Sequence, residues 1–147
     1  MRLSTKMRYG TRALAELASV YPHGSLPVKE LARRQNLSVK YLEQIMSALK
    51  AGGLTSAVRG VNGGHELTRP PSEIKLSDVF RALEGPLMLI ECTEHPEKCR
   101  LSRDCPSLPL WRNITVAIQS VLENTTLQDL LDQWRPSSRP MAQSYQI

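Results

Sequence analysis

Apolar residues recur at every third or fourth position along much of the chain, which is the spacing of one helical face. Two stripes of this kind are Leu14, Leu17, Ala18, Tyr21 and Leu42, Ile45, Met46, Leu49. The first stripe ends at Pro22–Ser25 and the second at Gly52-Gly53, because proline and glycine interrupt helices. Between them, residues 28–34 predict a short helix that opens after Pro27, and Ser38 is a suitable N-cap for the next helix.

A hairpin pattern follows these two short helices. Residues 54–58 predict a strand, residues 59–64 are rich in glycine, and residues 65–68 return as a second strand. Two short helices joined by a tight turn at residues 35–37 are typical of a helix-turn-helix. A hairpin directly after them is the wing of a winged helix-turn-helix. The sequence therefore predicts a mainly α fold with a small β-wing.

The second half of the chain predicts a fourth helix over residues 76–83 and then a loop over residues 91–109 with little helical pattern. A long amphipathic helix begins near Leu110, and Thr126–Asp129 form a candidate capping box for a last short helix through Trp134. Because the apolar stripe of the long helix must pack on something, we predict a homodimer, with packing inside the same chain as the alternative. The predicted domains are a winged helix-turn-helix at 1–86, a cysteine loop at 87–109, a dimerisation helix and terminal helix at 110–134, and a flexible tail at 135–147.

Composition narrows the function classes. The chain has 147 residues, 41% of them hydrophobic and 22% charged, which is an ordinary globular balance. No apolar run is long enough to span a bilayer and the N-terminus lacks an apolar secretion signal, so the expected location is the cytoplasm, with no membrane partner. No nucleophile–base pair, P-loop or dinucleotide fingerprint is present, so we do not expect an enzyme.

The net charge of +5 is unevenly distributed. Residues 1–69 hold 11 Lys and Arg against 4 Asp and Glu, a net charge of +7. Residues 70–147 hold 8 against 10, a net charge of −2. The basic part coincides with the predicted winged helix, which indicates a polyanion-binding module, although a basic solvated surface would have the same composition.

The outward face of the predicted second helix of the helix-turn-helix carries side chains suited to DNA. Gln44 can pair with adenine and Glu43 can accept a hydrogen bond from a cytosine amino group. Lys40 and the Ser38 hydroxyl can reach phosphates. Arg59, among the glycines of the wing, suits a narrow minor groove. The alternative is a solvated helix face beside an ordinary hairpin.

Three cysteines, Cys92, Cys99 and Cys105, fall within fourteen residues. An odd number of cysteines in a reducing compartment argues against a set of structural disulfides. Zinc sites more often use pairs two to four residues apart, whereas thiolates on a flexible loop suit an iron–sulfur cluster. Three loop cysteines without a ligand, or a thiol redox switch, remain alternatives.

Taken together, these segments resemble the Rrf2 family of bacterial transcription regulators, of the IscR and NsrR type, over roughly residues 1–134. The resemblance rests on residues 1–4 with 8–10, on 38–49, on Arg59-Gly60 with Gly63-Gly64, on 83–86, on the three cysteines and on 125–130. It implies a homodimeric winged-helix regulator in which Cys92, Cys99 and Cys105 hold an iron–sulfur cluster, with [2Fe–2S] favoured over [4Fe–4S]. It also implies that Tyr41, Glu43, Gln44 and Arg59 read DNA.

Two positions depart from that family pattern. Where such proteins carry a fourth ligand, this chain has Leu108 or Arg8. His95 is then the first local candidate for the fourth ligand, and Glu91, Glu94 or Asp104 are the next candidates. The expected function is a regulator that binds a palindromic operator in double-stranded DNA. Its DNA affinity would be controlled by a cluster that senses redox state, iron–sulfur status or nitric oxide. The alternatives are a cluster-free thiol-based or metabolite-sensing repressor of the same fold, and an iron–sulfur electron carrier.

Overall fold

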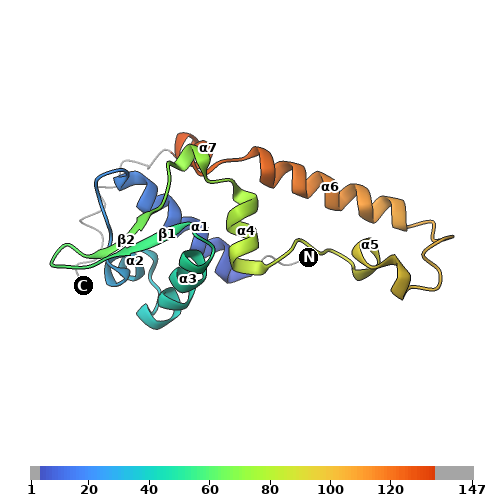
Figure 1. Cartoon of the computed structure of the whole chain (residues 1–147), viewed down its shortest axis with the longest axis horizontal. Helices are drawn as coiled ribbons and strands as arrows, with labels where there is room; N and C mark the ends of the chain where they lie inside the picture. The colour runs from blue at the N-terminus through green and yellow to red at the C-terminus, as the bar shows by residue number, and fades with distance from the viewer. Residues whose placement is uncertain (1–3, 135–147) are drawn as a thin grey trace.

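The computed structural model describes residues 4–134, which form a winged helix-turn-helix body and a projecting helical arm (Figure 1). The expected fold class, mainly α with a two-stranded antiparallel wing, is confirmed. The elements in chain order are α1 (Thr5–Val20), α2 (Val28–Gln35), α3 (Val39–Ala51), β1 (Thr55–Val58), β2 (Gly64–Leu67), the 3-10 turn η1 (Pro71–Glu73), α4 (Leu76–Glu84), α5 (Glu91–Glu94), the 3-10 turn η2 (Pro96–Lys98), α6 (Leu108–Asn124) and α7 (Leu127–Gln133).

The helix-turn-helix is set by local signals. Asn36 ends α2 in the left-handed conformation, with a φ of 53°, which asparagine tolerates better than most residues. Ser38 then caps α3, because its Oγ accepts a hydrogen bond from the Tyr41 N–H at 3.2 Å. The predicted cap is therefore confirmed, and α2 and α3 are joined by a turn of three residues.

One hydrophobic core fills the body. Its completely buried side chains come from α1, α2, α3, α4, α7 and the segments between them, and burying each leucine contributes about 2 kcal/mol. The largest of them are Leu14, Leu17, Leu31, Leu42, Ile45, Met46, Leu49, Leu54, Ile74, Val79 and Leu127. The inward residues predicted from the two apolar stripes lie in this core, apart from Tyr21, which is half-buried at its edge.

The wing pairs β1 with β2, with Thr55 opposite Leu67 and Val58 opposite Gly64. Leu26 adds a short bridge on the outer side of β2, through hydrogen bonds of 2.9 Å in both directions with His65. Gly64 permits this close approach, because a Cβ there would lie 2.4 Å from the Leu26 carbonyl carbon. The wing is thus attached to the segment that precedes α2.

Helix α4 lies tightly against two other helices of the body. A Cβ on Gly10 of α1 would lie 2.5 Å from a Leu83 methyl group. A Cβ on Gly52, at the end of α3, would lie 2.6 Å from the Ala82 Cβ. Both glycines therefore allow α4 to approach the backbone of α1 and the end of α3.

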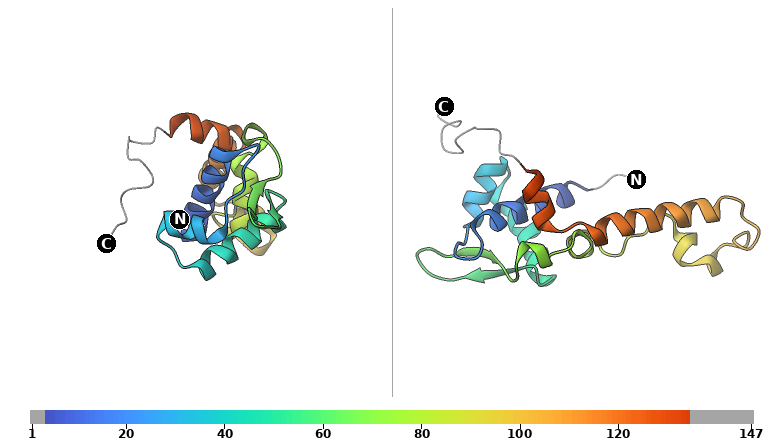
Figure 2. Two further views of the ribbon diagram at one scale, coloured as in Figure 1. Left: turned by 90° about the vertical axis from the view of Figure 1, so that its left-hand side faces the viewer. Right: turned by 90° about the horizontal axis from the view of Figure 1, so that it is seen from above.

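The arm consists of α6, with α5 beside it, and extends away from the body in both views that show its length (Figures 1 and 2). The chain then returns, because α7 packs on α1 and the Leu127 side chain is completely buried in the core. Backbone hydrogen bonds from Leu76 to Thr125 at 2.9 Å and from Leu127 to Ile74 at 2.8 Å fix this return. The capping box at Thr126–Asp129 is confirmed.

The segment predicted as a loop at residues 91–109 differs from the expectation. It contains α5 and η2, each a single turn, and α6 begins at Leu108, two residues earlier than its apolar stripe suggested. The Lys98 ammonium reaches the Glu91 carboxylate at 2.6 Å across these turns, and Pro109 suits the first turn of α6. The predicted flexible tail at 135–147 lies outside the described residues.

Across residues 4–134, the structure contains no helix with the length and apolar character required to cross a membrane.

Candidate nucleic-acid interface and cysteine segment

Helix α3 has one buried face and one exposed face. The apolar residues predicted to point inward are at most 1% exposed. Lys40, Glu43 and Gln44 lie on the solvent side, and the capping residue Ser38 is exposed as well. The first two turns of α3 therefore present a cation, an anion and an amide to the surroundings, with the hydroxyl of Ser38 at the end of the helix.

Tyr41 is half-buried and is held by α1. Its hydroxyl is 2.9 Å from the Thr5 Oγ1, and its ring meets the Tyr9 ring edge-on, with centroids 6.2 Å apart. The guanidinium groups of Arg8 and Arg12 lie 5.4 and 5.9 Å from the centroid of the Tyr9 ring, within the range of cation–π attraction. Thr5 and Tyr9 thus support Tyr41, and the sequence analysis missed both.

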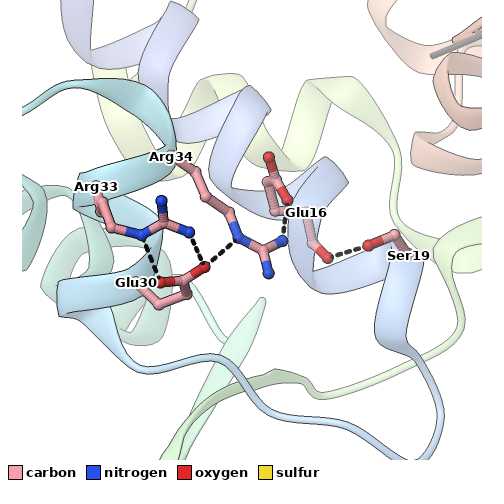
Figure 3. A network of polar contacts seen from close by, with 5 residues as sticks. All are labelled: Glu16, Ser19, Glu30, Arg33 and Arg34. Atoms are coloured by element: carbon pink, nitrogen blue, oxygen red, sulfur yellow. Dashed lines mark hydrogen bonds and ion pairs between the residues drawn. The ribbon is translucent and has the colours of Figure 1, made fainter. Parts of the chain in front are cut away.

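A network of charged side chains joins α1 to α2 (Figure 3). The Arg34 guanidinium reaches Glu16 at 2.7 Å and Glu30 at 2.8 Å, and Arg33 also donates to Glu30. Hydrogen bonds from the two arginines lower the pKa of the Glu30 carboxyl from 4.5 to about 2. The network fixes the first helix of the helix-turn-helix on the body and so helps to orient α3.

The wing places Arg59 in solvent at the end of β1, directly before Gly60, which has a φ of 113°. His65 of β2 pairs through its backbone with Leu26, and its Nδ1 is buried without a hydrogen-bond partner. Burial, and to a lesser extent the charge of Lys50, lowers the pKa of the His65 imidazole. These surroundings favour the neutral form of the His65 imidazole, which lies in β2 close to the turn of the wing.

The three cysteines lie on the segment between α4 and α6, and all are half-buried and unpaired with one another. Cys105 Sγ is 3.3 Å from the Ser107 Oγ, and hydrogen bonding to Ser107 lowers the pKa of the Cys105 thiol. His95 Nδ1 lies 3.2 Å from a Glu97 carboxylate oxygen. His95 is therefore occupied by a neighbouring acid in this arrangement.

The predicted metal ligands are not gathered at one point. Within residues 4–134, no three His, Cys, Asp or Glu side chains are grouped closely enough to hold a metal ion. Three thiols have the chemistry that iron requires, but this arrangement of Cys92, Cys99, Cys105 and His95 does not fit a cluster. The segment would have to rearrange before it could hold one.

A cavity of about 350 Å³ connects the cysteine segment to the body. Phe80 and Arg81 of α4 form one wall, and Gln119 and Leu122 of α6 form another. Glu94 and His95 of the cysteine segment also line it. Helix α4, which contacts the end of the α3 helix, therefore also borders the space beside the cysteine segment.

Comparison with known proteins identifies the family of this chain. The model of the Rrf2 family, described as an iron-dependent transcriptional regulator, matches residues 3–133. The HTH-type transcriptional regulator CymR of Bacillus subtilis (strain 168) is 39% identical over 130 residues, covering 88% of this chain and 89% of CymR. These relatives are transcriptional regulators and not enzymes, as expected from the sequence.

Solved structures agree with this identification. The structure of CymR (YrzC), the global cysteine regulator of B. subtilis, superposes with a TM-score of 0.74 at 36% identity and covers 92% of this chain and 99% of its own. T. potens IscR superposes with a TM-score of 0.73 at 33% identity and covers 95% of this chain and 92% of its own. The chain therefore belongs to the Rrf2 family of DNA-binding transcriptional regulators.

Proposed function

We propose that this protein binds a palindromic operator in double-stranded DNA through α3 and the wing, and that the chemical state of the cysteine segment changes its DNA affinity. The observation that carries the DNA-binding part is the geometry of α3. Its inner residues are fixed in the core, while Lys40, Glu43 and Gln44 are exposed on its first two turns. This is the part of a recognition helix that meets base edges in the major groove.

The proposed contacts have separate roles. Glu43 and Gln44 read bases, Lys40 and the Ser38 hydroxyl contact phosphates, and Arg59 enters the minor groove. The phenol of Tyr41 is the remaining contact, and Thr5 and Tyr9 hold its ring beside the start of α3. Glu43 also disfavours unsuitable sequences, because a carboxylate near phosphates is repelled unless a base amino group satisfies it.

The DNA test uses the full chain and duplexes selected from a random pool by the wild-type protein. Glu43→Ala should change which sequences are selected, while Arg59→Ala should weaken binding to all of them and reduce the salt dependence of binding. Glu73→Ala, an exposed acid on η1, is the matched control and should leave selection unchanged. Equal small losses on every sequence for both Glu43→Ala and Arg59→Ala would contradict these roles.

For the mechanism by which the cysteine segment would change DNA affinity, the geometry favours thiol oxidation. The three cysteines are half-buried and free, Cys105 contacts the Ser107 hydroxyl, and no three ligand side chains of the described residues are grouped as a metal site requires. In such a site a thiol takes one oxygen atom from a peroxide, giving a sulfenic acid and water. A second thiol then condenses with the sulfenic acid to form a disulfide and a second water. The disulfide would shorten the segment and move the wall of the cavity beside α4.

An iron–sulfur cluster is the second candidate for the sensor. It is favoured by three cysteines within fourteen residues and by the description of the family model as iron-dependent. Cys92, Cys99 and Cys105 would hold the irons, with His95 as the candidate fourth ligand, after a rearrangement of the segment. The cluster would supply reversible one-electron chemistry and a reaction centre for nitric oxide.

One experiment separates the two sensors. Protein purified without oxygen is assayed for iron, acid-labile sulfide and visible absorption, before and after addition of peroxide. Thiol sensing predicts none of these signals and a peroxide-dependent change of DNA affinity that Cys→Ala variants abolish. Bound iron and sulfide that are lost in the same variants would instead establish the cluster.

The proposed homodimer rests on α6. Leu110, Ala117 and Val121 are exposed and recur at the spacing of one helical stripe, while Leu108 and Thr115 are buried and Leu122 packs against the core of the body. Contact between two such stripes would bury apolar surface that is now in water. Two recognition helices related by a two-fold axis would match a palindromic operator.

A further inference from the structure

The tip of the wing carries an apolar side chain with no neighbours in its own chain. Val61 is 104% exposed, and Val58 on the other side of Arg59 is 36% exposed. The turn over residues 59–64 contains one arginine and no acidic residue, so it is complementary in charge to a polyanion. A β-branched apolar residue in a basic turn therefore has no partner within the described residues.

Hydrogen bonds to backbone carbonyls fix the turn at the tip of the wing. The Ser25 hydroxyl donates to the Asn62 carbonyl at 2.7 Å, and the Gly63 N–H donates to the Gly60 carbonyl at 3.0 Å. A Cβ on Gly63 would lie 2.6 Å from the Val58 carbonyl oxygen, so the turn is tightly folded. The turn that carries Arg59 and Val61 is therefore fixed through its backbone, and the two residues are separated by Gly60 alone.

We propose that Val61 is a specificity-determining residue that reads the floor of the minor groove beside Arg59 and selects A·T pairs there. This inference rests on the proposed binding of DNA through the wing. In the minor groove, A·T pairs present acceptors only, whereas G·C adds the N2 amino group of guanine. The methyl groups of valine cannot accept a hydrogen bond from that amino group, and burying it without a partner costs free energy.

The test changes the minor groove and leaves the major groove unchanged. In the duplex selected by the wild-type full chain, adenines in the segment contacted by the wing are replaced by 2,6-diaminopurine, which adds the N2 amino group. We expect wild-type affinity to fall roughly tenfold, as for one buried unsatisfied donor. Replacing guanine by hypoxanthine, which removes the amino group, should restore the affinity of an inactive G·C-substituted duplex.

The variant Val61→Thr distinguishes the effect of Val61 on binding from the effect of neighbouring residues. Threonine has nearly the same shape, but its hydroxyl can accept the added amino group, so the diaminopurine penalty should fall to about twofold. Because Val61 is fully exposed, the variant should fold as the wild type does. Arg59→Ala should bind every duplex more weakly and keep the penalty.

The outcomes distinguish the inference from the function on which it rests. An equal diaminopurine penalty in the wild type and in Val61→Thr overturns the role of Val61, as does a penalty that disappears only in Arg59→Ala. In both cases DNA binding itself stands. A wild-type protein that selects no duplex, and whose binding does not weaken with salt, overturns the proposed function and this inference together.

Discussion

Arg34 connects two carboxylates that lie on different helices, and this makes it an important side chain for the geometry of the DNA-binding body. Its exposed fraction is 23%, and it bonds Glu16 on α1 and Glu30 on α2. Glu16 itself is buried, so removing Arg34 would leave a carboxylate in the interior without its cation. The pair of helices is therefore oriented by charge as well as by the apolar core.

The Glu30 carboxyl makes the free energy of unfolding depend on pH. Its pKa is about 2 in the folded chain and 4.5 as a free group, so the carboxylate stabilises the fold fully above about pH 4.5. That stabilisation is lost as the pH falls toward 2. We expect Glu30→Gln to lower the free energy of unfolding at pH 7 by about 0.5–1 kcal/mol, after solvent screening, and to have little effect near pH 2. Urea unfolding at several pH values measures both quantities.

The control for this prediction is Glu73→Gln, which removes an exposed acid that makes no ion pair in the described part of the chain. It should change the free energy of unfolding little at any pH. A loss for Glu30→Gln that stays constant from pH 7 to pH 2 would rule out the ion pairs as its cause.

Cys105 should react at lower pH than an ordinary thiol. Hydrogen bonding to Ser107 lowers the pKa of the Cys105 thiol, and Ser107→Ala removes the side-chain part of that effect. The variant should therefore shift the pH dependence of Cys105 alkylation by iodoacetamide to higher pH. Peptide mass spectrometry reads the modification at each cysteine separately, and an unchanged profile would exclude Ser107 as the cause.

Residues whose role is local could be identified from the sequence, and those whose role depends on distant contacts could not. Ser38 and the box at Thr126–Asp129 were predictable because a cap bonds backbone groups two or three residues away. Thr5 lies 36 positions from Tyr41 and has no sequence pattern that links the two. The supports of the proposed DNA contacts were for that reason missed, although several of the contacts were named.

Among elements, the contact of α4 with the end of α3 allows a double-mutant test. Gly52→Ala would bring two Cβ atoms to 2.6 Å, and we expect it to cost about 1–3 kcal/mol in the free energy of unfolding. Ala82→Gly alone should cost up to about 1 kcal/mol through helix propensity. In the double variant the clash is absent, so the two losses should not add. Strict additivity in urea unfolding would contradict a direct contact.

Helices with several turns were predictable and single-turn helices were not. The apolar stripes of α1, α3 and α6 repeat over two turns or more, and this periodicity has a clear signature. Helix α5 has four residues and η2 has three, which is too short for any period. Their position depends on the ion pair of Glu91 with Lys98 and on Pro96, and a loop was the natural expectation for that composition.

At the scale of the whole molecule, the exposed stripe on α6 predicts that a charge placed in it will disrupt the proposed dimer. Val121→Glu should convert a species of twice 16.5 kDa into one of 16.5 kDa in sedimentation experiments, because it places a charge in the proposed interface. Gln119→Glu adds the same charge at an exposed position on the opposite side of α6 and should leave the mass unchanged. A wild-type protein that sediments at 16.5 kDa would contradict the dimer directly.

The arrangement of the cysteine segment could not be predicted from the sequence. The spacing of Cys92, Cys99 and Cys105 indicates that a reactive centre lies on one segment, and this segment is indeed continuous between α4 and α6. Spacing does not determine where thiols on a segment of little regular structure point. Their arrangement would depend on whether a disulfide or a bound cluster connects them, and the spacing of the cysteines does not distinguish these two cases.

The return of α7 to the body has a consequence for the connectivity of the chain. The core is completed by Leu127, so residues 85–126 form an excursion that leaves one folded unit and comes back to it. Replacing residues 88–124 by a linker of about six residues, enough to follow the roughly 14 Å length of α4, should leave a small protein that still folds. A chain cut after residue 86 would lack Leu127 and leave a cavity in the same core. The DNA-binding body should therefore tolerate removal of the arm better than truncation after α4.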